Sequence, residues 1–234
     1  DSESRGLGDV YKRQPISFPT MPIKSEEEIT KITKSLYQTF TLRRTIRHFS
    51  QKHISKETIH NCIKIASTAP SGANHQPWHF VAISNKTIKK KIREAAEIEE
   101  KKFYSSLNKD EWLKALEPIG TGPNKEHLEK APWLIIVFAE RYGVKIDGST
   151  YKNYYVTESV GIASGFLMSA IHQAGLYCLV HTPNPMSFLT KICKRPTSNK
   201  PLMILAIGHP AKKAKVPYAA TIKKPIEQIL TILS

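Results

Sequence analysis

The chain has 234 residues, of which 40% are apolar and 24% charged, and it carries a net charge of +15. This composition excludes a disordered or fibrous chain, and no apolar run approaches the ~20 residues that a membrane span needs. The cysteines, Cys62, Cys178 and Cys193, lack metal-ligand spacing and leave an odd thiol in any disulfide scheme. We therefore expect no metal site and no membrane association, in the reducing environment of the cytoplasm.

The basic charge is spread along the whole chain and shows no basic stripe interleaved with aromatic residues. A strongly basic protein can bind nucleic acid, a membrane surface or an anionic ligand. Because no nucleic-acid-binding motif is present, we expect a solvated basic surface and a small anionic ligand, with no nucleic-acid partner.

The first 14 residues do not resemble part of a folded domain. Residues 4–14 spell Ser-Arg-Gly-Leu-Gly-Asp-Val-Tyr-Lys-Arg-Gln, which resembles a translated sequencing adapter. We therefore expect residues 1–14 to be an artefactual, disordered segment. Residues 25–234 contain no internal repeat or linker, and we expect them to form a single domain.

Helix and strand patterns alternate from residue 25 onward. Ser25 and Glu28 form a predicted capping box for a helix to about residue 40, and Ser55 caps a second helix that ends before Pro70. Next come a buried strand at 78–83, a helix at 87–107, a Pro/Gly loop at 118–123 and an apolar strand at 133–139. A helix rich in small residues follows at 153–174, then strands at 176–180 and 202–207 with a short helix at 186–193 between them. The pattern predicts an α+β domain with a core sheet of four or five strands.

Two segments carry groups suited to chemistry. Arg43, Arg44, Thr45 and Arg47 gather three guanidinium groups and a hydroxyl, which suits a phosphate, although a solvated basic helix end is the alternative. The loop from Ala69 to Trp78 offers a serine hydroxyl and, at Gly72, a backbone that a flat ligand can approach, although a plain turn is the alternative.

Together, Arg-Arg-Thr-Ile-Arg-His-Phe and Ala-Pro-Ser-Gly-Ala…Gln-Pro-Trp-His-Phe resemble the nitroreductase superfamily of flavin mononucleotide (FMN) enzymes. The resemblance continues through Ala-Gly-Leu at 174–176, His-Thr-Pro at 181–183 and Lys-Lys-Pro at 223–225. It implies a nitroreductase-like fold with a central, mostly antiparallel sheet flanked by helices. It also implies an intertwined homodimer with FMN at the subunit interface.

The resemblance assigns cofactor-binding residues by position. Arg43, Arg44 and Thr45 should hold the ribityl phosphate, and Arg47 should lie near the flavin pyrimidine, where a cation stabilises the reduced ring. Lys223 stands where many relatives have a phosphate-binding Arg, and it keeps the charge without the bidentate fork. The remaining implied FMN contacts are Pro70, Ser71 and Gly72, with Ser71 and Gly72 reaching the flavin of the neighbouring subunit, and Val180, His181 and Thr182.

Within this superfamily, the segment at about 97–130 resembles the lid of the iodotyrosine deiodinases. Glu100, Tyr104 and Lys125 match its acid, phenol and amine. The alternative is that Glu100 and Lys125 are salt-bridged surface residues and that Tyr104 is half-buried. The resemblance implies that Glu100 binds the substrate ammonium and Lys125 its carboxylate, with the Tyr104 hydroxyl bridging. The backbone N–H of Ala73 should meet the phenolate of a substrate stacked on the flavin.

Thr182 is the implied catalytic residue, because a threonine hydroxyl at this place in the deiodinase pattern forms a hydrogen bond with flavin N5, which favours one-electron steps. We therefore expect FMN-dependent reductive dehalogenation of halotyrosines, with NAD(P)H or a reductase as electron donor. The alternative is a general FMN-dependent nitro or quinone reductase using NAD(P)H. A basic binding protein without catalysis is a further alternative of a different class.

Overall fold

The structure, a computed structural model, describes residues 15–17, 20–105, 110–145 and 147–233. The predicted artefactual segment 1–14 and residues 106–109 of the predicted lid lie outside the described residues. Backbone contacts divide the chain into two compact units, residues 1–41 and residues 42–234. The expectation of one domain over residues 25–234 stays a prediction.

The first unit contains the helix α2 (Glu26–Thr41). Its predicted capping box is present: the Glu28 backbone N–H donates to Ser25 Oγ at 3.2 Å, and the Ser25 N–H donates to the Glu28 carboxylate at 2.8 Å. These two bonds satisfy backbone donors that a helix start otherwise leaves open. None of the described residues of α2 is buried.

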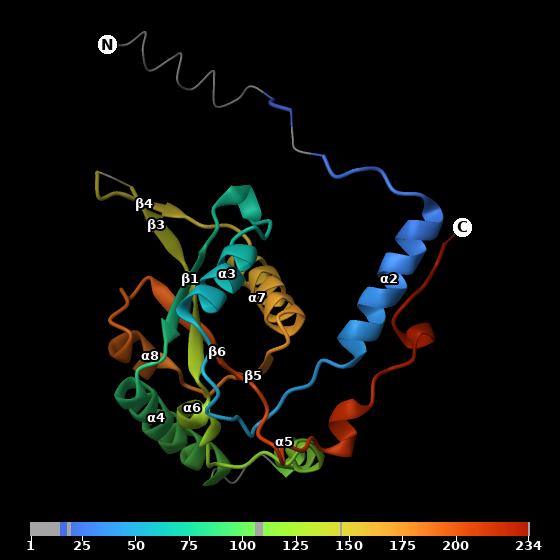
Figure 1. The fold of residues 1–234 in the computed structure, drawn as a ribbon. Helices are drawn as coiled ribbons and strands as arrows, with labels where there is room; N and C mark the ends of the chain where they lie inside the picture. Colours follow the sequence, from blue (N-terminus) through green and yellow to red (C-terminus); the bar gives the residue numbers. More distant parts are fainter. Residues whose placement is uncertain (1–14, 18–19, 106–109, 146, 234) are drawn as a thin grey trace. The chain divides into compact units, whose positions relative to one another are not determined.

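The second unit is built on a four-stranded sheet (Figure 1). Its strands are β1 (Trp78–Ile83), β2 (Trp133–Glu140), β6 (Asn199–Gly208) and β5 (Tyr177–His181), in that spatial order. Every neighbouring pair is antiparallel, which confirms the predicted α+β class with an antiparallel core sheet. The strand β1 was predicted as buried but has only Ile83 fully buried, because it lies at a sheet edge.

The two faces of the sheet carry separate layers of core. Along β2, Leu134, Ile136 and Phe138 join one cluster, and the alternate residues 135, 137 and 139 join the other. This alternation follows from the two-residue period of a strand. The helices α3 (Lys56–Ala66) and α7 (Val156–Gln173) supply residues to one cluster. The other cluster receives residues from α4 (Lys86–Ser105), α6 (His127–Lys130) and α8 (Ser187–Ile192).

Several short elements were not predicted from the sequence. They are the hairpin of β3 (Tyr142–Val144) and β4 (Thr150–Lys152), the helices α5 (Asp110–Leu116) and α6, and the 3₁₀ turns η1 (Gly72–Asn74), η2 (Glu117–Ile119), η3 (Tyr218–Thr221) and η4 (Ile226–Gln228). Each is too short for a hydrophobic period to be read reliably. Among the described helices, none combines the length and apolar character that crossing a bilayer requires.

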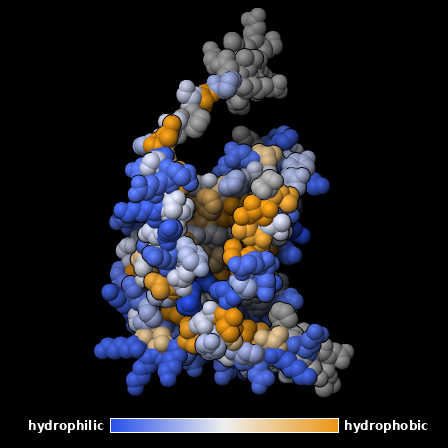
Figure 2. Space-filling model, turned by 90° about the vertical axis from the view of Figure 1, so that its right-hand side faces the viewer, coloured by the Kyte–Doolittle hydropathy of each residue, from blue (hydrophilic) through white to orange (hydrophobic). Residues whose placement is uncertain are grey.

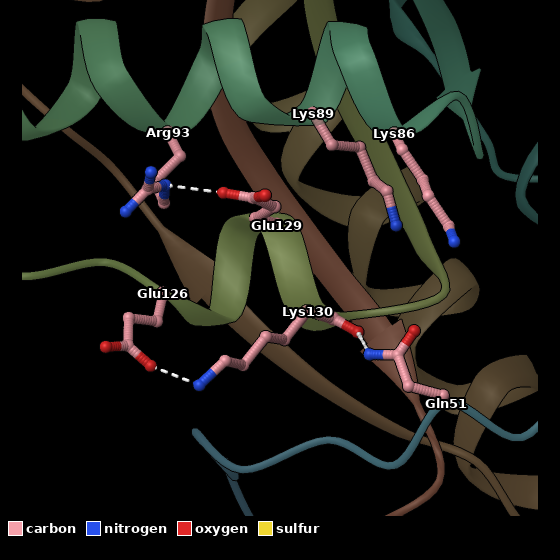
Figure 3. Close-up of a pocket in the computed structure, with 7 residues that line it drawn as sticks. All are labelled: Gln51, Lys86, Lys89, Arg93, Glu126, Glu129 and Lys130. Carbon is pink, nitrogen blue, oxygen red and sulfur yellow. Dashed lines mark hydrogen bonds and ion pairs between the residues drawn. The ribbon is translucent and has the colours of Figure 1, made fainter.

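The short helix α6 is fixed to α4 by polar contacts that line a hollow of about 420 Å³ (Figure 3). The buried Lys89 ammonium donates to the carbonyl oxygens of Ala131 and, at 3.3 Å, Pro132. Arg93 pairs with Glu129 at 2.8 Å. The charged groups facing this hollow therefore hold α6 and the two residues that follow it in place.

We predict that Lys89→Met lowers the free energy of unfolding by about 1–3 kcal/mol, because it leaves buried carbonyl oxygens without their donor. Urea denaturation at pH 7 measures this change. The matched control is Lys86→Met, since Lys86 lines the same hollow but is exposed, and its loss should cost less than about 0.5 kcal/mol. Equal effects of the two replacements would contradict the anchoring role of Lys89.

Candidate active site

Predicted site residues from three distant parts of the chain meet around a cavity of about 320 Å³. The volume is within the range of small-molecule sites. The cavity lies between α4, the loop that precedes α6, and the end of β5. The predicted residues that line it are Arg47, Glu100, Tyr104, Lys125, Val180, His181 and Thr182.

Arg47 reaches this cavity because its segment runs beside the edge strand β5. Thr45 forms a parallel bridge with Cys178, so Arg47, two residues further along, lies next to Val180. Ile46 between them is buried and belongs to the core. Burial lowers the pKa of Arg47 from its ordinary value, with an opposing influence from Tyr104. A half-buried guanidinium at the cavity wall is a ready partner for an anionic ligand.

The acid, phenol and amine predicted from the lid are brought together. The Lys125 ammonium lies 3.1 Å from Glu100 Oε2, with the two side chains 5% and 12% exposed. The same ammonium lies 5.8 Å from the centre of the Tyr104 ring. Burial raises the pKa of Tyr104, against a hydrogen bond with Thr121 that lowers it. The Tyr104 phenol is therefore neutral at pH 7 and can donate a hydrogen bond.

One face of α4 explains why these groups converge. Lys89, Arg93, Glu97, Glu100 and Tyr104 are spaced three or four residues apart, which places them along a single helical stripe. Beyond the contacts of Lys89 and Arg93 with α6, Glu97 Oε1 accepts a hydrogen bond from the Lys125 backbone N–H at 2.8 Å. Glu97, which lies one helical turn before Glu100 on this stripe, thus holds the backbone of Lys125 in place.

A pair of buried histidines lies against this ion pair. His181 ends β5 and His127 begins α6, and their rings meet edge to face with centres 5.7 Å apart. The His181 Nε2 lies 3.6 Å from Glu100 Oε1. Burial, followed by the Lys125 charge, lowers the pKa of each histidine to about 3. Sequence reasoning had placed His181 among cofactor contacts and gave no role to His127.

The loop of Pro70, Ser71, Gly72 and Ala73 does not line this cavity. It precedes β1, which lies three strand spacings from β5, or roughly 14 Å across the sheet. The close approach that Gly72 permits is to the same chain, because an added Cβ would lie 2.6 Å from the Tyr154 carbonyl oxygen. The Ser71 hydroxyl accepts a hydrogen bond from the Gln76 N–H at 2.9 Å.

The backbone of this loop has an unusual conformation. Ala73, Asn74 and Gln76 all have positive φ angles near 50°, a region that non-glycine residues rarely adopt. The N–H groups of Gly72, Asn74, His75 and Gln76 all donate within the protein. The N–H of Ala73 makes no hydrogen bond to any described residue, so it remains available as a donor to a ligand.

The other predicted phosphate-binding residues lie outside the cavity lining. Arg43, Arg44 and Thr45 are partly buried along the segment that leads to Arg47, and Lys223 is exposed beyond η3. Their roles stay predictions.

Thr121 lines the cavity and hydrogen-bonds Lys125 Nζ at 3.4 Å, but it was not among the residues predicted from the sequence. The sequence offered only one indication of this contact, namely that Thr121 lies four residues before Lys125. No cluster of three or more His, Cys, Asp or Glu side chains suited to a metal occurs in the part of the chain that the structure describes.

The histidine pair predicts that acid destabilises the fold. An unfolded histidine has a pKa near 6.5, and the folded values are about 3, so the unfolded state binds more protons between these limits. The free energy of unfolding should fall by about 2 kcal/mol per histidine from pH 7 to pH 5. Urea unfolding across this range tests it, with pH 7 to 8.5 as the flat control. His181→Gln should remove about half of the loss, and an unchanged slope would contradict the assignment.

Comparison with known proteins identifies the family of this chain. Residues 41–209 match the model of the Nitroreductase family. The chain is 50% identical over 207 residues to an iodotyrosine deiodinase of Haliscomenobacter hydrossis, covering 88% of this chain and 93% of the relative. It is 37% identical to human iodotyrosine deiodinase 1 over 88% of this chain and 71% of that protein.

A crystal structure of oxidised iodotyrosine deiodinase, bound to FMN and 3-iodo-L-tyrosine, superposes with a TM-score of 0.66 at 31% identity. The match covers 76% of this chain and 90% of that structure. With the family match spanning most of its length and the acid, phenol and amine grouped at one cavity, this chain belongs to the nitroreductase family, as a member similar to the iodotyrosine deiodinases.

Proposed function

We propose that this protein is an FMN-dependent oxidoreductase that reductively dehalogenates halogenated tyrosines. In the reaction the aryl carbon–halogen bond is replaced by a carbon–hydrogen bond and halide leaves, which consumes two electrons and one proton. Bound FMN would supply the electrons, and NAD(P)H or a reductase would be their source. The identities to iodotyrosine deiodinases support this assignment.

The observation that carries the proposal is the Glu100–Lys125 pair beside Tyr104 at one cavity. A free amino acid has an ammonium and a carboxylate on adjacent atoms, so it needs an anion and a cation side by side. Glu100 and Lys125 meet this need, and both are largely buried, where charge-assisted hydrogen bonds are strongest. A nitroaromatic or quinone substrate would have no use for this pair.

The residues around the cavity fit FMN. Arg47 offers a half-buried cation and Thr182 an exposed hydroxyl at the same wall. Val180 is 40% exposed there, which gives a flat ring an apolar contact. Arg43, Arg44 and Thr45 lead up to Arg47 and would hold the phosphate, with Lys223 as a further candidate cation. When bound, FMN accepts and passes on electrons one or two at a time.

We also propose that the protein acts as a homodimer. Ser71, Gly72 and Ala73 lie too far across the sheet to reach their own cavity, so the implied contacts require a neighbouring subunit. The helix α7 leaves a face uncovered, where Ile162 and Phe166 are 43% and 39% exposed and no described atom lies near a Cβ built at Gly161. Figure 2 shows apolar surface left exposed among hydrophilic residues on one side of the protein.

In the assembled site each side chain has a defined task. Glu100 and Lys125 bind the two ends of the zwitterion, Tyr104 donates between them, and the Ala73 N–H stabilises the phenolate. The Thr182 hydroxyl would form a hydrogen bond with flavin N5. The three free thiols of Cys62, Cys178 and Cys193 support the proposed cytoplasmic setting.

Anaerobic turnover tests the function. The FMN-loaded, dithionite-reduced protein should release iodide from diiodotyrosine and yield tyrosine. A nitroaromatic under the same conditions is the comparison substrate. Fast nitro reduction without iodide release would favour a general nitro or quinone reductase, and failure to bind FMN would favour a basic binding protein.

We predict that Glu100→Gln weakens 3-iodo-L-tyrosine binding to the oxidised holoenzyme by about 1.5–3 kcal/mol, because a charged hydrogen bond to the ammonium is lost. Quenching of flavin fluorescence measures the affinity. Glu99→Gln is the matched control, since Glu99 lines the same cavity but pairs with Lys102 at 3.0 Å. Equal affinity in the Glu100 variant and the parent would make Glu100 a structural acid only.

Thr182→Ala separates binding from chemistry. Because the hydroxyl is assigned to the flavin and not to the zwitterion, affinity for 3-iodo-L-tyrosine should stay within about twofold. Iodide release should slow at least tenfold, roughly the loss expected for one hydrogen bond at a reacting centre. Unchanged iodide release would remove Thr182 from the mechanism.

A further inference from the structure

His181, one of the two buried histidines, faces the same carboxylate as Lys125. Glu100 has two carboxylate oxygens: Oε2 lies 3.1 Å from Lys125 Nζ, and Oε1 lies 3.6 Å from His181 Nε2. Each oxygen therefore faces a different nitrogen. The His181 atom is fully enclosed and has no hydrogen-bond partner among the described residues.

This contact is close to a hydrogen bond without being one. An N–H···O bond has a heavy-atom distance near 2.9 Å, so the distance from His181 Nε2 to Glu100 Oε1, 3.6 Å, exceeds it by about 0.7 Å. A small rotation of the Glu100 carboxylate would close this gap. Because an unpaired polar atom in the interior costs free energy, the protein gains when the carboxylate turns toward His181.

The neutral His181 ring can orient the Glu100 carboxylate through a hydrogen bond without adding a positive charge beside it. Burial and the nearby Lys125 charge keep the pKa of His181 far below 7, so the imidazole is neutral and carries one N–H. Opposite a carboxylate, the tautomer with the proton on Nε2 is favoured. The His127 ring, edge-on at 5.7 Å, restricts the orientation of this N–H.

Substrate binding must separate the ion pair that fills the cavity wall. The zwitterion brings an ammonium to Glu100 and a carboxylate to Lys125, so the direct contact between these side chains is lost. The substrate ammonium takes the place of Lys125 on Glu100, and a buried carboxylate remains costly unless its other oxygen also has a donor. His181 is the donor that faces this opposite oxygen.

We propose that His181 is a positioning residue for amino-acid recognition: its neutral N–H holds Glu100 when Lys125 turns to the substrate carboxylate. This inference rests on the proposed function, and it moves His181 from the flavin contacts to the zwitterion clamp. Selectivity for a halotyrosine over a halophenol, which lacks both charged groups, then depends on His181.

Binding to the oxidised FMN-loaded protein tests this, with 3-iodo-L-tyrosine and 2-iodophenol as the two probes. His181→Leu should raise the Kd for iodotyrosine at least tenfold and change the Kd for iodophenol less than twofold. His181→Gln, which restores a neutral N–H donor, should return the iodotyrosine Kd to within about threefold of the parent. His181→Phe, which keeps a ring but no N–H, should behave as His181→Leu and covers the case in which the leucine variant does not fold.

A double-mutant cycle isolates the coupling to Glu100. In a Glu100→Gln background, His181→Leu should change the iodotyrosine Kd less than twofold, because the charged partner is already gone. Equal weakening of both probes, or additive effects in the cycle, would overturn the proposal and return His181 to packing or flavin binding. If the parent binds iodotyrosine and no His181 variant alters its Kd, this inference fails while the proposed function stands. If the parent does not bind it, both fail.

Discussion

The enclosed ion pair of Glu100 and Lys125 is the interaction on which the site depends. Taking two charges out of water is costly, and their attraction offsets that cost only when the geometry is good and other hydrogen bonds complete the set. Here Thr121 and His181 flank the pair on either side. A substrate zwitterion presents the same two charges in reverse, so it can replace each partner with another of equal sign. Under the proposed function, the pair is therefore both a stable resting arrangement and a template for the ligand.

The fold supplies this pair through one face of α4. The residues that fasten α6 to α4, Lys89 and Arg93, belong to the same helical stripe as Glu100 and Tyr104. Because Glu97 also holds the Lys125 backbone, the position of the Lys125 amine depends on the packing of the following loop against α4.

The sequence was most informative where signals are local. The apolar run at 133–139, the capping box at Ser25 and the spacing of Glu100 and Tyr104 all depend on near neighbours, and the strand and helices appear where expected. The contact of His181 with Glu100 could not be predicted, because it joins residues 81 positions apart. The crowding at Gly72 could not be predicted either, since an added Cβ would meet Tyr154 of the same chain, and the ligand contact of Gly72 stays a prediction. A motif indicates that a glycine is needed without indicating which atoms crowd it.

The division of the site across the sheet has a consequence for activity. Arg47 and Thr182 lie beside β5, whereas the Ala73 N–H lies before β1 at the other edge. A flat ligand held at β5 can meet that N–H only if a second copy of the chain supplies it. The acid and amine that select the substrate would then come from one subunit and the phenolate donor from the other. Under this arrangement dissociation of the dimer would abolish recognition of the ring while leaving the charged clamp intact, so assembly and specificity are linked by geometry.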